Sequence, residues 1–557
     1  MYRGFKVIVS LTLHAVVPRC CFFHILSINI KKGCFMKKLA VFCVFFAVGF
    51  VSACLCAEPA AVSVTGDWSI QVDYAGQSAQ LTVAEPEIVE KINEKYDKIE
   101  VYNPNGPEWH RGTVLRGASA LECAITGTIL PDSVQVRLAP DSEPLVNGTD
   151  YQLDGANGTF GRLDGGKIGA DTAVFVTYQH VPMRLDSVVQ NADGSIALVR
   201  GVPHGSMPAM PPLADGQKRL ANIYLTGPME KLTDANVYPI LEEGDVFDDP
   251  GQGCAETMLP KTWAKLHNGE PLKILAWGDS VTAGGFIPSE EQWQAQFVER
   301  LKKRFPNAKI ELVTEAWGGR NSDSYFAQPA GAEHNYQEKV LDAAPDLIIS
   351  EFVNDAGFNA EKVEQNYGRM RDDFEKIGAE WIILTPHYVR PGWMGFSSQK
   401  NIDNDPRAYV TALRNFAAAN HIALADGAAR YGRLWRQGIP YITLMTNNIN
   451  HPNGFGMGLF ANALMALFET QSPQTNNSNG GAADDSANNA ADDSASDAGV
   501  ILSLDRPVGE TVVIPVALGG LPAAGVNRQT LGGVELYTAK KKFSRSSSPV
   551  LTVITER

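Results

Sequence analysis

The chain is short of cysteine once its first sixty residues are passed. Six of its eight cysteines lie between residues 20 and 56, and only Cys123 and Cys254 follow. The sequence has no CxxC pair and no cluster of histidine and cysteine, so it shows no sign of a zinc site, and we expect neither a metal nor a cofactor. Cys123 and Cys254 are compatible with one disulfide or with two thiols, and the sequence does not decide between them.

Positive charge is also in short supply. Lys and Arg number 48 against 62 Asp and Glu, which gives a formal net charge of −14. A nucleic-acid-binding surface needs concentrated basic residues, so the composition argues against nucleic acid as a partner. Part of the acidity belongs to residues 471–499, which are rich in Asn, Ala, Asp, Ser and Gly and have no hydrophobic period. We expect a flexible acidic linker there.

The apolar run near the amino terminus is too short to span a membrane comfortably. It covers residues 39–51, follows a basic start at Met36, and precedes several small residues. This arrangement is typical of a secretory signal, which we place at residues 36–57. Residues 1–35 have no evident structural logic, and we interpret them as a mis-annotated upstream extension. We expect an exported protein, which is periplasmic, attached to the cell surface or secreted.

Two kinds of signal processing remain open. The segment from Val51 to Cys54 resembles the lipobox of bacterial lipoproteins, which implies a lipid on Cys54 and anchoring to a membrane surface. Ordinary cleavage after Ala57 is the alternative.

Residues 60–250 have mostly the two-residue period of half-buried strands, separated by turn signals such as Asn147-Gly148 and Asp193-Gly194. They predict a β-rich, β-sandwich-like domain, with two small domains as the alternative. Strand character returns at residues 512–516, so residues 500–557 predict a small β-rich tail.

Residues 270–468 have a different sequence pattern, in which apolar runs alternate with amphipathic helices. This alternation predicts a three-layer α/β/α domain with a five-stranded parallel sheet. The predicted strands lie at residues 274–277, 310–313, 347–349, 381–384 and 422–425.

Four polar segments follow the strands or lie near the end of this region. The first segment ends in Gly278-Asp279-Ser280, and the other three cover residues 315–322, 351–355 and 447–453. The carboxyl ends of parallel strands meet at one edge of a sheet, where open α/β folds bind their ligands. Glycines around Ser280 permit a tight turn that exposes its hydroxyl group. We therefore expect the four segments to converge on one site.

The order of these segments resembles the SGNH (GDSL-like) hydrolase family, over a little more than a third of the chain. The resemblance implies that Ser280 is the nucleophile and His451 the general base. It also implies an oxyanion hole made of the backbone N–H groups of Ser280 and Gly319 and the side-chain amide of Asn354. Gly318 is the alternative to Gly319. A serine hydroxyl needs an adjacent base, and the oxyanion needs fixed donors, so the residue types fit the chemistry.

Two positions depart from the family pattern. One is Phe352, where the third segment of the family normally starts with glycine, and we expect this change to alter the shape of the pocket more than the mechanism. The other lies before the histidine. The family usually has Asp three residues before the histidine, and this chain has Asn448. We expect the amide oxygen of Asn448, a backbone carbonyl or another carboxylate to orient His451. Asp279 and Asp355 are acidic neighbours of the site. The carboxylates that lie near strand ends and are candidates for orienting His451 are Glu351, Asp355 and Asp426.

A β-domain before an SGNH-like domain in an exported protein resembles bacterial carbohydrate esterases, which implies acylated polysaccharide as the substrate. A lipid esterase is one alternative. A non-catalytic, glycan-binding surface protein is another, favoured by Asn448. Aromatic side chains that could stack on sugar rings are Trp317, Tyr388 and Trp393. Two further side chains could contact an acidic or sulfated sugar, namely Arg320 and His387.

Overall fold

A computed structural model of the chain describes residues 58–121, 123–242, 253–402 and 405–469, and the backbone of four strands after residue 510. The chain divides into two compact units, Met1–Pro473 and Gln474–Arg557. The expected upstream extension, signal and acidic linker lie outside the described residues. No helix within the described ranges is both long and apolar enough to cross a membrane.

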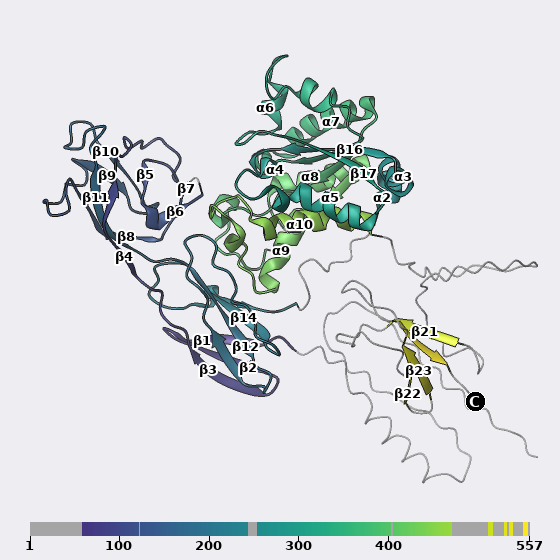
Figure 1. Ribbon diagram of the computed structural model, residues 1–557, viewed down its shortest axis with the longest axis horizontal. Helices are drawn as coiled ribbons and strands as arrows, with labels where there is room; N and C mark the ends of the chain where they lie inside the picture. Colours follow the sequence, from purple (N-terminus) through teal and green to yellow (C-terminus); the bar gives the residue numbers. More distant parts are fainter. Residues whose placement is uncertain are drawn as a thin grey trace, which may run out of the picture. The chain divides into compact units, whose positions relative to one another are not determined.

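A parallel sheet forms the centre of the α/β domain (Figure 1). Its strands have the order β17-β16-β18-β19-β20. The strands are β16 (Pro271–Gly278), β17 (Lys309–Ala316), β18 (Leu347–Glu351), β19 (Glu380–Leu384) and β20 (Ala423–Ala425). Each overlaps one of the five predicted apolar runs, so the prediction of a five-stranded parallel sheet is confirmed.

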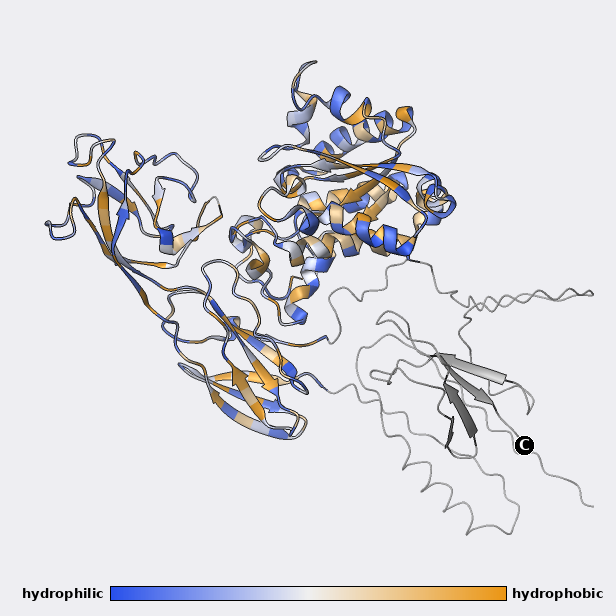
Figure 2. Ribbon diagram, in the orientation of Figure 1, coloured by the Kyte–Doolittle hydropathy of each residue, from blue (hydrophilic) through white to orange (hydrophobic). Residues whose placement is uncertain are grey.

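The helices cover both faces of this sheet. They are α2 (Ala255–Met258), α3 (Pro260–Asn268), α4 (Ser280–Ala283), α5 (Trp293–Arg304), α6 (Ser322–Phe326), α7 (Ala360–Ile377), α8 (Ala408–Asn420), α9 (Gly427–Arg433) and α10 (Gly454–Met465). Along β16, Leu275 and Trp277 join the core with α7 and α8, while Ile274 and Ala276 join the core with α5 and α10. Successive side chains of a strand point to opposite faces, so the domain has the three predicted layers. Hydrophobic colour gathers in the interior of this domain in Figure 2, while the edge strand β17 also contains charged residues.

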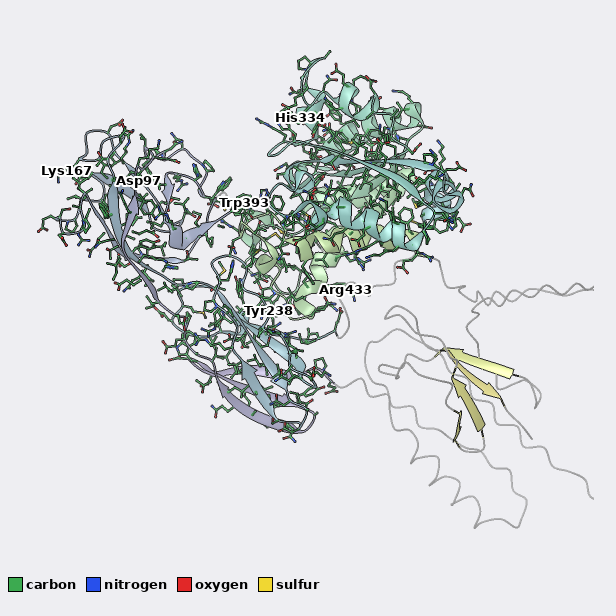
Figure 3. All side chains as sticks on the ribbon, in the orientation of Figure 1. Asp97, Lys167, Tyr238, His334, Trp393 and Arg433 are labelled. Carbon is green, nitrogen blue, oxygen red and sulfur yellow. The ribbon has the colours of Figure 1, made fainter. Side chains whose placement is uncertain are left out.

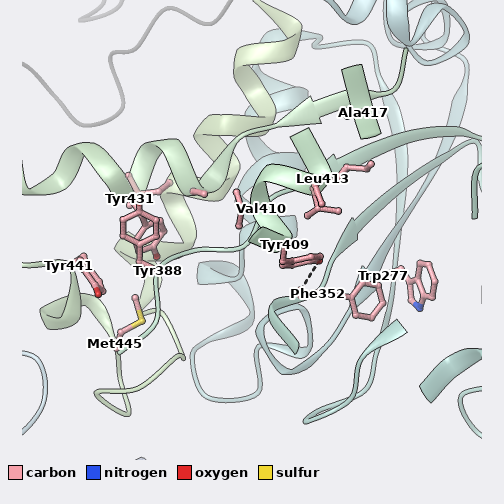
Figure 4. Packing of buried hydrophobic residues seen from close by; sticks show 14 of the residues in the cluster. Trp277, Phe352, Tyr388, Tyr409, Val410, Leu413, Ala417, Tyr431, Tyr441 and Met445 are labelled. Atoms are coloured by element: carbon pink, nitrogen blue, oxygen red, sulfur yellow. Dashed lines mark hydrogen bonds between the residues drawn. The ribbon is translucent and has the colours of Figure 1, made fainter. Parts of the chain in front are cut away.

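Aromatic side chains fill the core on the α7 and α8 side of the sheet (Figure 4). Trp277 is fully buried there and packs edge-on against Phe352, with ring centroids 4.9 Å apart. The hydroxyl group of Tyr409, on α8, donates a hydrogen bond of 3.0 Å to the carbonyl of Phe352. This bond fixes α8 to the segment that follows β18.

The start of α8 differs from the pattern of the sequence, in which Asp405-Pro406 is a good helix start. The helix begins at Ala408 with Arg407 as its N-cap residue. The carboxylate of Asp405 instead accepts from the guanidinium of Arg407, with an Oδ2–Nη2 distance of 2.6 Å. This charge-assisted bond uses the capping side chain for a local ion pair.

Two hydrophobic cores organise the β-rich region that precedes the parallel sheet. The first core is enclosed by the sheets β1-β2-β3 and β13-β12-β14-β15, and the second by β4-β11-β8 and β5-β10-β9. The first group of strands is β1 (Ala61–Gly66), β2 (Ser69–Tyr74), β3 (Gln77–Thr82), β12 (Arg184–Gln190), β13 (Ile196–Val199), β14 (Lys218–Leu225) and β15 (Val237–Pro239). The second is β4 (Val89–Tyr96), β5 (Thr113–Val114), β8 (Ile129–Arg137), β9 (Tyr151–Asp154), β10 (Thr159–Arg162) and β11 (Val174–His180).

The second β-core is therefore inserted in the chain between β3 and β12 of the first. Antiparallel pairing throughout these four sheets agrees with the sandwich-like prediction. Cys123 and Cys254 do not form a disulfide, so of the two alternatives the structure has the thiols.

The second unit contains one described sheet. Its strands pair antiparallel in the order β21-β24-β23-β22. They are β21 (Thr511–Pro515), β22 (Arg528–Leu531), β23 (Val534–Thr538) and β24 (Val550–Ile554). The predicted β-rich tail is present.

Candidate active site

The serine turn is held by close contacts at the end of β16. A Cβ atom on Gly278 would lie 2.2 Å from the carbonyl oxygen of Glu351, so only glycine fits there. Asp279 is fully buried and caps α4, because its Oδ1 accepts from the N–H of Val281 at 3.1 Å. Its Oδ2 accepts from the N–H of Asn354 at 2.8 Å. Asp279 thus ties the serine turn to the segment after β18.

The structure brings Ser280 and His451 together. The Oγ of Ser280 and the Nε2 of His451 are 3.1 Å apart, which is hydrogen-bond distance. Burial lowers the pKa of His451 to about 4, so its imidazole is neutral and able to accept a proton at neutral pH. A serine hydroxyl beside a neutral imidazole is the arrangement of an activated nucleophile.

Asn447, which the sequence did not single out, organises the histidine loop. Its Oδ1 accepts from the backbone N–H groups of Ile449, Asn450 and His451, at 2.9, 2.9 and 3.0 Å. The loop is closed by a bond of 2.7 Å from the N–H of Thr446 to the carbonyl of His451. Asparagine commonly forms such side-chain turns, which was the only signal in the sequence.

Two expected oxyanion donors lie on turns beside the serine. Gly319 has a φ of +70°, which favours glycine, and its N–H makes no backbone hydrogen bond within the described residues. A Cβ atom on the preceding Gly318 would lie 3.8 Å from the Cβ of Ser280, which places this turn against the serine.

Asn354 is the other expected donor. Its Nδ2 is buried and makes no hydrogen bond to another described residue. This nitrogen lies close enough to the carboxylate of Asp279 to favour its charged form, but the two groups do not have hydrogen-bond geometry. A buried amide donor without a partner is unfavourable unless a ligand accepts from it.

Asn448 does not orient His451. Its Nδ2 donates to the backbone carbonyl of Ser206 at 3.3 Å and lies 3.8 Å from the sulfur of Met183, both in the β-rich region. The Nδ1 of His451 is buried and has no hydrogen-bond partner in the described part of the chain. None of the three alternatives for orienting His451 is seen as a hydrogen bond to its Nδ1 among the described residues, and the Nδ2 of Asn448 bonds to the β-rich region instead.

The other carboxylates are also engaged elsewhere. Glu351 accepts from the hydroxyl of Thr282 at 3.1 Å, and Asp426 pairs with Arg414 at 2.8 Å. Asp355 accepts from the N–H of Ser322 at 2.9 Å. None of the three makes a described hydrogen bond to His451.

Burial raises the pKa of three carboxyl groups beneath the site. The pKa of Asp279 and that of Asp355 both rise to about 7, and backbone N–H donors oppose the rise. The pKa of Glu351 is raised well above its ordinary range, first by burial and then by the charge of Asp279. These carboxyl groups accept hydrogen bonds from neighbouring segments of the fold, and none of them makes a described hydrogen bond to His451.

Two of the residues expected to contact a sugar are buried. The hydroxyl of Tyr388 donates to the carbonyl of Ile402 at 2.7 Å, and the Nε2 of His387 lies 2.8 Å from the carbonyl oxygen of Asn450. Both side chains have no exposed surface, so neither can contact a substrate, and these expectations are corrected.

Other expected aromatic residues have accessible surface. Trp393, labelled in Figure 3, is 45% exposed. Its ring lies 5.2 Å from that of Trp109 in the β-rich region. Its indole N–H donates to Glu108 at 3.3 Å. Trp317, half-buried, stacks on His334 with centroids 4.7 Å apart, and the guanidinium of Arg320 lies 5.2 Å from the Trp317 ring. Within the described residues no group of three or more His, Cys, Asp or Glu side chains could hold a metal ion.

The sequence of this region matches a known family. Residues 276–459 fit the family model described as the GDSL-like Lipase/Acylhydrolase family. The α/β domain is a GDSL-like hydrolase domain. The resemblance inferred from the four segments is confirmed over these residues, and the domain is that of an ester hydrolase. We refer to this part as the hydrolase domain.

Solved structures give similar matches. A two-domain esterase active on acetylated mannans, crystallised with mannopentaose, is 20% identical, with a TM-score of 0.32. The match covers 41% of this chain and 58% of that chain, so it spans little more than half of the esterase. An acetyl xylan esterase is 20% identical over 35% of this chain and 98% of its own, with a TM-score of 0.28.

A third similar structure is a member of the lipolytic protein G-D-S-L family from Veillonella parvula DSM 2008. It is 18% identical over 35% of this chain and 98% of its own, with a TM-score of 0.27. No curated protein matches the chain.

Proposed function

We propose that the chain is an exported serine esterase that removes acetyl or other short acyl groups from polysaccharide. The observation that supports it most strongly is the 3.1 Å approach of Ser280 Oγ to His451 Nε2 at the carboxyl edge of the sheet. After export, the mature protein would either carry a lipid on Cys54 or begin after cleavage at Ala57. The mass of the amino-terminal peptide of the mature protein distinguishes these two.

The reaction has two halves. His451 takes the proton of Ser280 as the hydroxyl oxygen attacks the ester carbonyl, and the tetrahedral oxyanion accepts from the N–H groups of Ser280 and Gly319 and from the amide of Asn354. Collapse releases the sugar alcohol, which takes the proton from His451, and leaves an acyl group on Ser280. Water then attacks the acyl group with His451 as the base, which releases the acid and returns the proton to Ser280.

The proposed substrate rests on the aromatic surface contributed by both domains. Trp393 of the hydrolase domain and Trp109 of the β-rich region lie together, and nearly half of the Trp393 side chain is exposed. Flat aromatic surfaces of this kind suit sugar rings. The loop that carries Trp393 is joined to the histidine loop by a bond of 2.7 Å from the N–H of Arg390 to the carbonyl of Ile449.

The test is acetate release from chemically acetylated mannan and xylan, together with hydrolysis of p-nitrophenyl acetate and p-nitrophenyl palmitate. We expect acetate release and a clear preference for the acetyl ester. Ser280→Ala should lower the rate by a factor on the order of 10⁴ or more. Equal, near-background rates for both proteins would defeat the proposal.

Two other functions are outcomes of the same experiment. Preference for the palmitoyl ester would indicate a lipid esterase. Polysaccharide binding without hydrolysis would indicate a glycan-binding surface protein, which the lack of a carboxylate partner for His451 Nδ1 in the described residues favours.

A further inference from the structure

The imidazole of His451 lies face to face with the ring of Phe286. The two ring centroids are 4.3 Å apart and the ring planes differ by only 4°. One nitrogen of the imidazole faces Ser280, and the other is buried without a hydrogen-bond partner among the described residues. The ring is therefore held at one edge by the serine and across one face by Phe286.

The turn that carries Phe286 is fixed to the serine itself. Gly284 ends α4 with a φ of +61°, and its N–H donates to the carbonyl of Ser280 at 3.0 Å. The side-chain amide of Gln292 donates to the carbonyl of Gly284 at 3.2 Å. The N–H of Ile287 donates to the same carbonyl at 3.2 Å. Phe286 thus sits at a fixed distance from Ser280, and so does the imidazole that stacks on it.

Serine hydrolases commonly use a carboxylate to hold the imidazole and to stabilise its protonated form. Here Asn448, Glu351, Asp355 and Asp426 all bind other groups. Resting on the proposed function, we propose that Phe286 is the positioning residue of His451. Its flat ring restricts rotation of the imidazole, and its π face stabilises the imidazolium that forms when His451 takes the proton of Ser280.

Simple electrostatics supports this role. The face of a phenyl ring is electron-rich, and its attraction to a cation is strongest where water is excluded. His451 is neutral when substrate binds and becomes a cation only as the serine attacks. An interaction with the cation therefore lowers the barrier of the chemical step and leaves substrate binding unchanged, so it acts on kcat and not on KM.

The test uses p-nitrophenyl acetate and the full-length protein with Phe286→Leu and Phe286→Tyr. Leu keeps the apolar contact and removes the π face, while Tyr keeps both. We expect Phe286→Leu to lower kcat about tenfold with KM nearly unchanged, and Phe286→Tyr to keep kcat within about threefold. Ile287→Val, on the same turn, is the matched control and should keep the original kcat.

The outcomes separate this inference from the proposed function. The role of the π face is overturned if kcat is unchanged in Phe286→Leu, or if Phe286→Tyr loses as much activity as Phe286→Leu. The proposed esterase function still stands in that case, provided that Ser280→Ala loses activity. Full activity in Ser280→Ala overturns the esterase and this inference with it. Thermal unfolding checks the fold of each variant. If Phe286→Leu does not fold, Phe286→Met replaces it, and the same two kcat values decide.

Discussion

The buried imidazole of His451 determines the pH range in which the proposed base can work. A general base must be neutral, and burial favours the neutral form, because it lowers the pKa from an ordinary value of 6.5 to about 4. The base is therefore lost only in acid well below the pH at which an exposed histidine becomes charged.

We expect kcat/KM for p-nitrophenyl acetate to rise with an apparent pKa near 4 and to stay level from about pH 5 to pH 7. The measurement is a pH–rate profile at constant ionic strength, from which the rate of the Ser280→Ala variant is subtracted as background. A rising limb centred near pH 6.5 would show that His451 is not held in the buried, neutral state.

The buried carboxyl groups beneath the site favour the folded state most strongly in the acid part of this pH range. The folded pKa of Asp355 is about 7, above its ordinary value of 3.8, so the folded state binds more protons than the unfolded state between these values. Its contribution to stability is fully present below the unfolded pKa and is lost as the pH rises through about 7. Asp279, with a folded pKa of about 7, acts in the same direction.

The turn from β16 to α4 requires glycine at position 278, because there is no room for a side chain. Gly278 faces the carbonyl of Glu351 and the side chain of Thr282, at 2.2 and 2.3 Å from the place of a Cβ atom. Backbone and packed side chains must both move to admit a methyl group there. The end of β16 and the orientation of Ser280 are therefore set by the same residue.

Gly278→Ala is expected to destabilise the protein by about 2 kcal/mol or more and to remove most of the esterase activity. Gly285→Ala is the matched control, since nothing lies within 4 Å of a Cβ atom at that glycine. Urea unfolding and p-nitrophenyl acetate hydrolysis measure the two effects. Equal stability in the two variants would contradict the tight contact between β16 and the segment after β18.

Patterns within single elements made much of the hydrolase domain predictable. Apolar segments predicted all five strands. The central strands are apolar because helices cover both faces, while β17, at the edge of the sheet, is partly exposed and contains Glu311. The segments containing Ser280 and Asn354 could be placed together because they follow parallel strands that end at one edge, while His451 was assigned through the family resemblance. The start of α8 could not be predicted, because the Asp405–Arg407 pair competes with the helix cap.

The parts of the site that the sequence could not reveal depend on distant partners. Asn448 meets Ser206, 242 residues away in the chain, and no local period links them. The stack of Phe286 on His451 joins two loops whose residues, taken singly, look like ordinary core residues. The burial of His387 and Tyr388 likewise follows from packing between segments and not from their own surroundings in the sequence.

At the scale of the whole folded unit, the β-rich region holds the histidine loop. The thiol of Cys123 donates to the carbonyl of Asn447 at 3.2 Å, and the carbonyl of Ser206 accepts from Asn448. Arg390, bonded to the same loop, pairs with Glu108 at 2.5 Å. The β-rich region is therefore part of the support of the candidate site.

We expect Asn448→Asp to lower both stability and activity, although it introduces the acid that the family usually has. A carboxylate would lose the donor to Ser206 and face its carbonyl, which costs about 1–3 kcal/mol or more. Asn448 has a φ of 56°, which Asp and Gly tolerate, so Asn448→Gly is the matched control and should be the milder change. Urea unfolding and kcat measure the pair. Higher activity in Asn448→Asp would show that the side chain reaches His451.

The central claim is that Ser280 is a nucleophile activated by His451. The most direct measurement is mass spectrometry after treatment with a fluorophosphonate, which reacts covalently with activated serines. We predict one phosphonyl group on the peptide that contains Ser280, with the labelling rate reduced at least about a hundredfold in His451→Ala. Labelling at another residue, or none in folded protein, would contradict the account.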